Sequence, residues 1–216
     1  MATYNISKSF HWDAPLSEKA VLLCRMFGLT VDQLAQRYGA HTCTVEINDG
    51  DIVYIRGPSG AGKSVLLREL ENRIPASERL NLNRIELPSD KTLIDCIDAD
   101  MVMSLRLLGY AGLSDCYCIL NQPNNLSDGQ KWRFRLAIAL AAKKKFIFAD
   151  EFCSALDRIT AAVISYNVYK FAKKTGTTFV LASCAKDILL DLAPDVLVTK
   201  PYSGPTEVTY KRSRRR

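Results

Sequence analysis

Residues 57–64 read Gly57-Pro58-Ser59-Gly60-Ala61-Gly62-Lys63-Ser64, which fits the pattern G-x-x-x-x-G-K-[ST]. Glycines let the backbone turn tightly and point successive N–H groups at one place, and the amino end of a following helix adds partial positive charge. Lys63 supplies an ammonium group and Ser64 a hydroxyl, which suit phosphate oxygens and a magnesium ion. The stretch therefore predicts a phosphate-binding loop.

The sequence on either side of the loop has the pattern that this motif needs. Asp51–Ile55 is an apolar run typical of a buried strand, and Ser64–Arg73 has the spacing of a helix. A loop that joins a strand to a helix directs its backbone N–H groups at a bound anion. We therefore expect the backbone from Gly57 to Val65 to contact the phosphates of a nucleotide.

A second apolar run ends in two carboxylates. Phe146–Ala149 predicts a buried strand, and Asp150 and Glu151 follow it directly. The strand would deliver Asp150 to the carboxyl edge of the sheet, where it would hold Mg²⁺ together with the Ser64 hydroxyl. Glu151 would point in another direction and suits a general base that polarises an attacking water. We expect Lys63, Asp150 and Glu151 to be the catalytic residues.

Short apolar runs alternate with helical patterns along most of the chain. The runs predict further strands, and the patterns between them predict helices. The strands are expected at Thr44–Ile47, Thr178–Ala182, Val196–Val198 and Glu207–Tyr210, and the helices near Thr92–Leu108, Asp128–Lys143 and Arg158–Thr175. This alternation predicts an α/β fold with a mostly parallel core sheet and an antiparallel edge.

The chain divides into three parts. Residues 1–40 read as a helical N-terminal segment, with two short helices around Gly28. Such helices can pack on the edge of a sheet, and they also match the outline of a helix-turn-helix. Residues 41–205 form the predicted core, with a helical insertion at about 75–145, and residues 206–216 add an edge strand and a basic tail.

The composition is that of a globular protein. The 216 residues are 48% hydrophobic and 24% charged, which excludes wholesale disorder. The longest apolar stretch, Leu136–Ala142, is too short to cross a membrane, and the polar residues 1–12 predict no signal peptide. The seven cysteines include no C-x-x-C pair, which disfavours zinc and disulfides and leads us to expect a cytoplasmic protein.

A third motif lies between the phosphate loop and the acidic strand. Residues 126–130 read Leu126-Ser127-Asp128-Gly129-Gln130 at the head of a predicted helix, and Ser154-Ala155-Leu156-Asp157 follows the acidic strand. Together with the phosphate loop, these motifs resemble those of the ABC-type ATPases, whose signature usually reads LSGGQ. The resemblance covers about residues 43–200, and Asp128 stands where the family has its first glycine.

The resemblance implies a P-loop NTPase fold of ABC type with a reduced helical subdomain, and Mg²⁺-dependent ATP binding and hydrolysis. In this family two protomers bind head to tail and enclose two ATP molecules. The γ-phosphate held by the partner's loop would then be contacted by Ser127, Asp128, Gly129 and Gln130, and Asp157 would organise the interface. Residues 149–158 (ADEFCSALDR) are similar to those of soluble, non-transporter ABC ATPases, some of which are fused to acetyltransferase domains.

Three departures from the family pattern bear on activity and partners. The family usually has a histidine after the last core strand; here Cys184 or Ala185 takes its place, so we expect slow hydrolysis. Glu86–Ser89 lies where the family has its Q-loop, and it contains no glutamine. The segment between Lys63 and Leu126 is also short. Because the Q-loop and the helical subdomain usually contact membrane partners, these features argue against a membrane partner.

The family also stacks an aromatic ring on adenine upstream of the phosphate loop. Tyr38, 25 residues before Lys63, is the best candidate for this ring, and His41 is the second. The alternative is that Tyr38 packs on the core at the end of a helix.

The formal net charge of +6 comes almost entirely from one end of the chain. Lys211–Arg216 holds five cations in six residues, and without them the basic and acidic residues nearly balance. A flexible basic arm of this kind either binds the phosphate backbone of DNA or RNA or is simply solvated. The run Lys143–Lys145 is typical of a solvated helix C-terminus.

Three functions remain open on the sequence. The main expectation is a homodimeric ATPase that acts on a nucleic acid or a protein partner. The alternatives are a nucleotide-gated binding module with little turnover, which the missing histidine favours, and the nucleotide-binding subunit of a membrane transporter, which the missing Q-loop disfavours.

Overall fold

The computed structural model describes residues 1–9, 15–30, 33, 41–185 and 187–211. The strands in these ranges are β1 (Ala2–Lys8), β2 (His41–Ile47), β3 (Ile52–Arg56), β4 (Arg79–Asn81), β5 (Phe146–Ala149), β6 (Thr178–Ser183), β7 (Val196–Thr199) and β8 (Glu207–Tyr210). The helices are α1 (Glu18–Met26), α3 (Lys63–Asn72), α4 (Met101–Tyr110), α5 (Cys116–Ile119), α6 (Asp128–Ala141), α7 (Arg158–Thr175) and α8 (Leu189–Leu192), with short 3₁₀ turns η1 (Leu82–Arg84) and η2 (Pro123–Asn125).

Six of the described strands form one large sheet with the order β4-β5-β6-β3-β7-β8, and β1 and β2 form a separate two-stranded ribbon. All neighbours in the large sheet run parallel except β7 and β8, which are antiparallel. The strand before the phosphate loop, β3, lies between β6 and β7, with Val53 opposite both Val180 and Val196. This order confirms the predicted α/β class, with its mostly parallel core and antiparallel edge.

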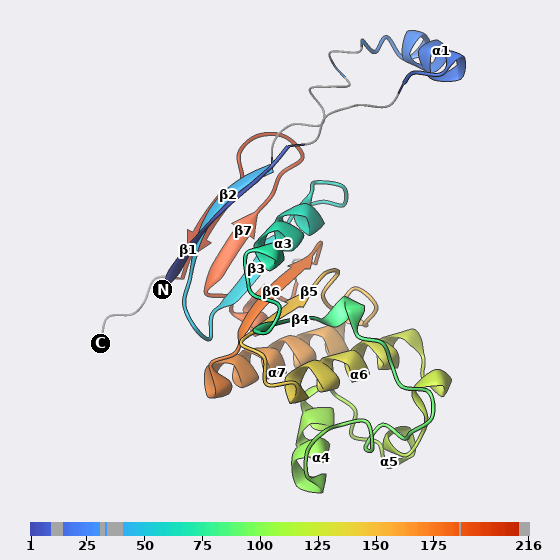
Figure 1. The fold of residues 1–216 in the computed structure, drawn as a ribbon, viewed down its shortest axis with the longest axis vertical. Coiled ribbons are helices and arrows are strands. Elements are labelled where there is room, and N and C mark those ends of the chain that lie inside the picture. The colour runs from blue at the N-terminus through green and yellow to red at the C-terminus, as the bar shows by residue number, and fades with distance from the viewer. Residues whose placement is uncertain (10–14, 31–32, 34–40, 186, 212–216) are drawn as a thin grey trace.

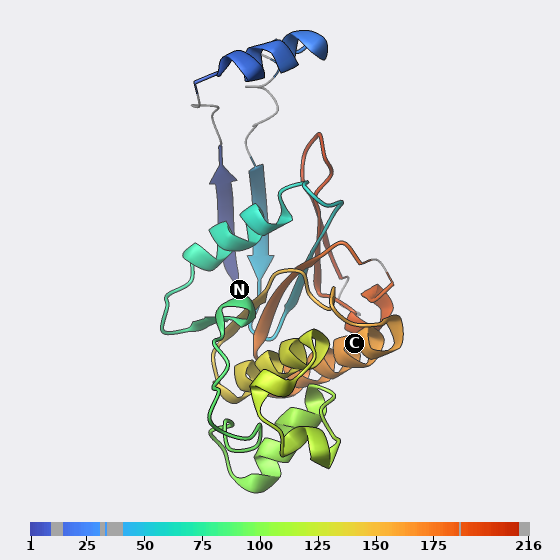
Figure 2. The ribbon, with the colours of Figure 1, turned by 90° about the vertical axis from the view of Figure 1, so that its right-hand side faces the viewer.

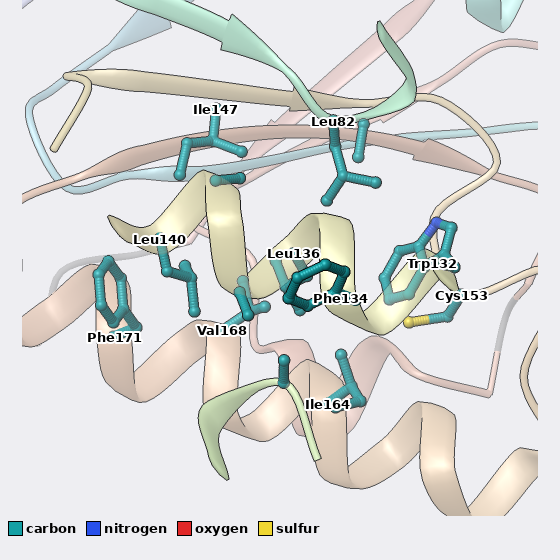
Figure 3. Close-up of a cluster of buried hydrophobic side chains, with 14 of the residues drawn as sticks. Leu82, Trp132, Phe134, Leu136, Leu140, Ile147, Cys153, Ile164, Val168 and Phe171 are labelled. Atoms are coloured by element: carbon teal, nitrogen blue, oxygen red, sulfur yellow. The ribbon is translucent and has the colours of Figure 1, made fainter. Parts of the chain in front are cut away.

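Alternate residues of β3 face the two sides of the sheet. Ile52 and Tyr54 belong to the buried cluster that includes α6 and α7, whereas Val53 and Ile55 pack with α3 and the β1–β2 ribbon. Both faces of the sheet are therefore covered, as a parallel sheet requires (Figures 1 and 2). Figure 3 shows the first cluster, where Phe134 of α6 points towards Val168 of α7 beneath β5.

The beginning of the chain differs from the prediction of a helical segment over 1–40. Ala2–Lys8 forms a strand that pairs antiparallel with β2, from Ala2 opposite Ile47 to Lys8 opposite His41. The ribbon is tied to the large sheet because the Glu46 N–H donates to the Tyr210 hydroxyl at 3.0 Å. Pattern reasoning missed β1 because only Ile6 of its residues is buried, so the apolar alternation is weak.

The predicted helix before Gly28 is present as α1, and none of its described side chains is buried. Thr30 and Gln33 form a reciprocal cap: the Thr30 N–H donates to Gln33 Oε1 at 2.9 Å and the Gln33 N–H to Thr30 Oγ1 at 3.2 Å. The rest of the predicted second helix lies outside the described residues.

The insertion at 75–145 also differs in two details. Arg79–Asn81 forms the edge strand β4, which the sequence did not predict, since three residues give no pattern to detect. The predicted helix over Thr92–Leu108 begins only at Met101, because the Asp100 side chain caps that point by accepting from the Met103 N–H at 2.9 Å.

Candidate nucleotide site

The phosphate loop joins β3 directly to α3, and Lys200 and His41 pack closely against its backbone. A Cβ atom on Gly57 would collide with the carbonyl oxygen of Lys200, and one on Gly62 would collide with the His41 ring. Gly62 also has φ of 93° and serves as the N-cap of α3, a conformation that favours glycine. The packing thus requires glycine at two positions of the motif. The loop, with its N–H groups, ends at the amino end of α3, which carries partial positive charge.

Lys63 is buried, and its ammonium group is held at the mouth of the loop. Its Nζ donates to the Pro58 carbonyl at 3.0 Å and to Cys184 Sγ at 3.1 Å. The sequence left Cys184 and Ala185 as alternatives for the position of the missing histidine. The structure brings Cys184 to the loop, while the Ala185 carbonyl accepts from the Tyr54 hydroxyl at 2.6 Å.

Tyr54 fixes the segment that carries Cys184. Its ring is fully buried under the sheet, and burial raises the pKa of its hydroxyl to about 12. The hydroxyl therefore stays protonated at neutral pH and keeps donating to Ala185, next to Cys184. This bond joins the strand before the phosphate loop to the loop after β6.

Asp150 and Glu151 follow β5 as predicted, and Asn83 of η1 clamps the first of them. The Asp150 N–H donates to Asn83 Oδ1 at 2.8 Å, and Asn83 Nδ2 donates to the Asp150 carbonyl at 3.0 Å. Glu151 has φ of 51°, in the left-handed region that a glutamate rarely adopts. Strained backbone of this kind is common at functional sites, where the surroundings hold the residue in place.

A buried glutamate connects this clamp to the helix of the phosphate loop. Glu71 of α3 accepts from Asn81 Nδ2 at 2.8 Å and from Arg84 Nη1 at 3.0 Å, and its carbonyl accepts from Arg79. These three donors belong to β4 and η1, the segment that also holds Asn83. One helix therefore fixes both the phosphate loop and the support of Asp150.

The residues expected to hold Mg²⁺ fit that ion. Ser64 lies in the first turn of α3, and Asp150 lines a hollow of about 390 Å³ together with Leu67 and Arg68 of the same helix. Hydroxyl and carboxylate oxygens are hard donors, and Mg²⁺ usually takes only one or two protein ligands beside phosphates and waters. A second hollow of about 490 Å³ lies on the other side of the loop, along Gly57 and Cys184.

Ser127–Gln130 begins α6 with a complete capping box. The Gln130 N–H donates to Ser127 Oγ at 3.3 Å, and the Ser127 N–H donates to Gln130 Oε1 at 2.9 Å. A Cβ atom on Gly129 would lie 3.2 Å from the Ala155 carbonyl, so the signature segment packs on the segment before α7. No hydrogen bond among the described residues joins Ser127–Gln130 to the phosphate loop of the same chain.

Asp157 is the N-cap of α7. Its carboxylate accepts from the N–H groups of Ile159 and Thr160 at 3.0 Å and from the Thr160 hydroxyl at 2.6 Å. The bonds from Thr160, together with a weaker one from Ile159, lower the pKa of Asp157. Asp157 therefore remains a carboxylate at neutral pH, aligned with the amino end of its helix.

Tyr38, the first candidate for the adenine-stacking ring, lies outside the described residues. His41, the second candidate, packs directly on Gly62 of the phosphate loop. Burial, and then the nearby ammonium of Lys200, lower the pKa of His41. A neutral imidazole beside the loop is compatible with a stacking role, which stays a prediction.

The basic runs are only partly described. In the tail, the Lys211 N–H donates to the Asp195 carbonyl at 2.8 Å, and residues 212–216 lie outside the described ranges. In the run Lys143–Lys145, Lys145 pairs with Asp49 at 3.2 Å and Lys144 donates to the Ser77 carbonyl at 2.8 Å. Lys143 and Lys145 are nevertheless exposed, so the turn lies at the surface as predicted.

No protein-family model matches the chain. Among curated proteins it is similar to the methionine import ATP-binding protein MetN of Streptococcus agalactiae serotype III, with 31% identity over 195 residues, and to that of Lactobacillus johnsonii, with 28% over 207 residues. The alignments cover 72% and 77% of this chain and 54% and 59% of those proteins. The chain therefore spans about half the length of the curated relatives that it matches.

Solved structures share the arrangement of strands and helices. The ATP-binding cassette MJ0796, a dimer in a post-hydrolysis state bound to ADP and Pi, superposes with a TM-score of 0.64 over 79% of this chain and 89% of its own, at 20% identity. The chain has the fold of an ABC ATPase cassette. The cassette is also similar to cbiO1 from Clostridium perfringens, part of the ABC transporter complex cbiONQ, with a TM-score of 0.60, 19% identity and 79% of each chain covered.

The comparisons confirm the predicted fold class and agree with the predicted ATPase class, but they correct the finer placement of the cassette. The sequence favoured the soluble, acetyltransferase-fused branch and argued against a membrane partner. The relatives named here are import ATP-binding proteins or part of a transporter complex, and none is named for a nucleic acid. Residues 149–158 misled because so short a stretch beside the acidic strand carries little information about the partner. No helix of the described residues is long and apolar enough to span a membrane.

We predict that Glu71→Ala lowers the free energy of unfolding by about 2–3 kcal/mol, because it leaves the donors of Asn81 and Arg84 without their shared acceptor. The matched control is Glu69→Ala on the same helix, whose pair with Lys8 is long at 3.8 Å and half-exposed, so its cost is below about 1 kcal/mol. Chemical denaturation measures both. Equal losses in the two variants would contradict the role given to Glu71.

Proposed function

We propose that this chain is the ATP-binding subunit of a membrane transporter of the import type, in which two cassettes bind ATP between them and hydrolyse it. The observation that supports the nucleotide part is the placement of Lys63: a buried ammonium at the mouth of a glycine loop, at the amino end of a helix. The transporter part rests on the similarity to the import ATP-binding proteins. The transported substrate is left open.

In this proposal the phosphate loop binds the β- and γ-phosphates through its backbone N–H groups and Lys63. Ser64 and Asp150 hold Mg²⁺, which supplies positive charge to the phosphate oxygens when bound. Glu151, placed directly after Asp150, accepts a proton from the attacking water. The two acidic residues are thus assigned to different atoms, Asp150 to the metal ion and Glu151 to the water.

The second half of each site comes from a partner cassette bound head to tail. The capping box at Ser127–Gln130 leaves the amino end of α6 positively polarised, which suits a γ-phosphate held by the opposite loop. Asp128 adds a negative charge at that end, where the family has a glycine, and this charge weakens the attraction. Asp157 lies close behind the segment and organises the contact.

A second candidate is a nucleotide-gated module with little turnover. Cys184 at the position of the usual histidine favours it, because a thiol is a weak hydrogen-bond partner for a phosphate oxygen compared with an imidazole. In that case ATP closes the dimer and its hydrolysis is incidental.

The transporter proposal is tested by where the native protein is found. We expect the chain to purify from detergent-solubilised membranes in a stable complex with an integral membrane protein, and ATP turnover of that complex to exceed that of the chain alone. Recovery of the chain only in the soluble fraction, with no membrane protein attached, would contradict the transporter part and leave the nucleotide part standing.

The role of Glu151 separates the two candidates. Glu151→Gln removes the proton acceptor but keeps the size of the side chain, so we expect turnover to fall by about 10²-fold or more while ATP-dependent dimers become more stable. Phosphate release and light scattering with Mg·ATP measure the two effects. If the wild type and the variant are equally inert while both dimerise with ATP, the second candidate replaces the first.

The thiol beside Lys63 gives a further prediction. Cys184→His places an imidazole next to the γ-phosphate position, and we expect it to raise the turnover number several-fold. Ala185→His is the matched control, since Ala185 packs against the hydrophobic core and its carbonyl is held by Tyr54, and it brings no gain. A gain in turnover from Ala185→His alone, or from neither variant, would show that Cys184 does not occupy the position of the family's usual histidine.

A further inference from the structure

Two helices on the face of the sheet away from α3 form a groove between them. The α4 and α7 helices are joined by a hydrogen bond from Asn167 Nδ2 to the Tyr110 carbonyl at 3.0 Å and by an edge-to-face contact of Tyr110 with Phe171 at 5.6 Å (Figure 1). The groove has a volume of about 420 Å³, and Met103, Leu107 and Phe171 give it an apolar lining. It lies away from the phosphate loop and takes no part in the nucleotide site.

The charges on the two helices have one sign. The sequences of α4 and α7 contain five basic residues and no carboxylate. Arg158 and Lys173 are paired with acidic residues elsewhere, at 3.6 and 2.7 Å. The other three, Arg106, Lys170 and Lys174, all line the groove, and none of them forms a salt bridge with a described residue.

The apolar lining of the groove is partly open to solvent. Met103, which lines the groove, is 43% exposed, and Val102, the residue before it, is 59% exposed. Clustered apolar side chains rimmed by charges mark a surface that another molecule covers. Methionines are common on such surfaces, because their flexible side chains adapt to the partner.

We propose that this groove, bounded by α4 and α7, binds an acidic amphipathic helix of a protein partner. The apolar side chains of that helix fill the hollow over Met103, Leu107 and Phe171, as helix-in-groove complexes do. Its carboxylates meet the three cations along the rim, none of which forms a salt bridge with a described residue.

The observations favour a peptide over the two other classes of anionic partner. The phosphate backbone of a nucleic acid would use the cations but leave the apolar lining of the groove exposed to water. A membrane surface is flat, so it cannot fill a concave groove with its own apolar groups. A helix with acidic and apolar faces satisfies both features at once.

The test uses the full chain and two synthetic peptides of about five helical turns with identical leucine spacing, one with glutamate and one with lysine at the remaining positions. Fluorescence anisotropy should show saturable binding of the acidic peptide, weakened by salt, and at least tenfold weaker binding of the basic one. Lys170→Glu should reduce the affinity for the acidic peptide by about tenfold, and Met103→Glu should do the same through the apolar lining. Arg73→Glu, an exposed reversal at the end of α3 on the other face of the sheet, should leave it unchanged.

All variants are first compared with the wild type by circular dichroism and thermal unfolding, because both groove positions are on the surface and should fold. The proposal is overturned by absence of binding, by equal binding of the two peptides, or by an affinity that Lys170→Glu does not change. It is also overturned if duplex DNA or vesicles of anionic lipid displace the acidic peptide and lose their own binding in Lys170→Glu, since the groove would then serve one of those surfaces.

Discussion

The backbone of Gly57–Ser64 must pass from a strand buried on both faces to the first turn of a helix while its N–H groups converge on one point. This constraint determines much of what surrounds it. Lys200 and His41 approach so closely that Gly57 and Gly62 have no room for side chains. The same helix that begins at the loop reaches back two turns later, through Glu71, to the segment that supports Asp150. The phosphate loop and the support of Asp150 are therefore joined through one helix.

The sequence was most informative where the structure depends on runs of residues. The strands at Phe146–Ala149 and Glu207–Tyr210 and the helix Arg158–Thr175 have their predicted bounds. A continuous apolar run marks the first strand, alternation of polar and apolar residues the second, and capping residues the helix. The strand β1 and the three-residue strand β4 were missed, since they depend on pairing with β2 and β5 rather than on their own pattern.

The same distinction holds for the site. Motif spacing identified Lys63, Asp150 and the cap at Ser127, whose roles are set by local sequence. Asn83 and Glu71 gave no signal, because a polar residue in an irregular stretch and a glutamate on an amphipathic helix are both ordinary in sequence. Their importance arises only when β4 pairs with β5 and brings them together. The class of partner was the weakest inference. It was drawn from the absence of a glutamine in Glu86–Ser89 and from the shortness of the segment between Lys63 and Leu126.

The contact between Lys63 and Cys184 gives the nucleotide site a chemical property of its own. A bulky substituent on this sulfur and the γ-phosphate of a nucleotide would compete for the same few ångströms around one ammonium group. Cys184 and Cys116 are the exposed thiols among seven free cysteines. With Cys116 and the partly exposed Cys24 and Cys96 replaced by serine, the rate at which a thiol reagent labels the protein becomes a direct readout of whether the site is occupied. Cys184, which stands where the family has a histidine, thus makes occupancy of the site measurable through the labelling rate of its thiol.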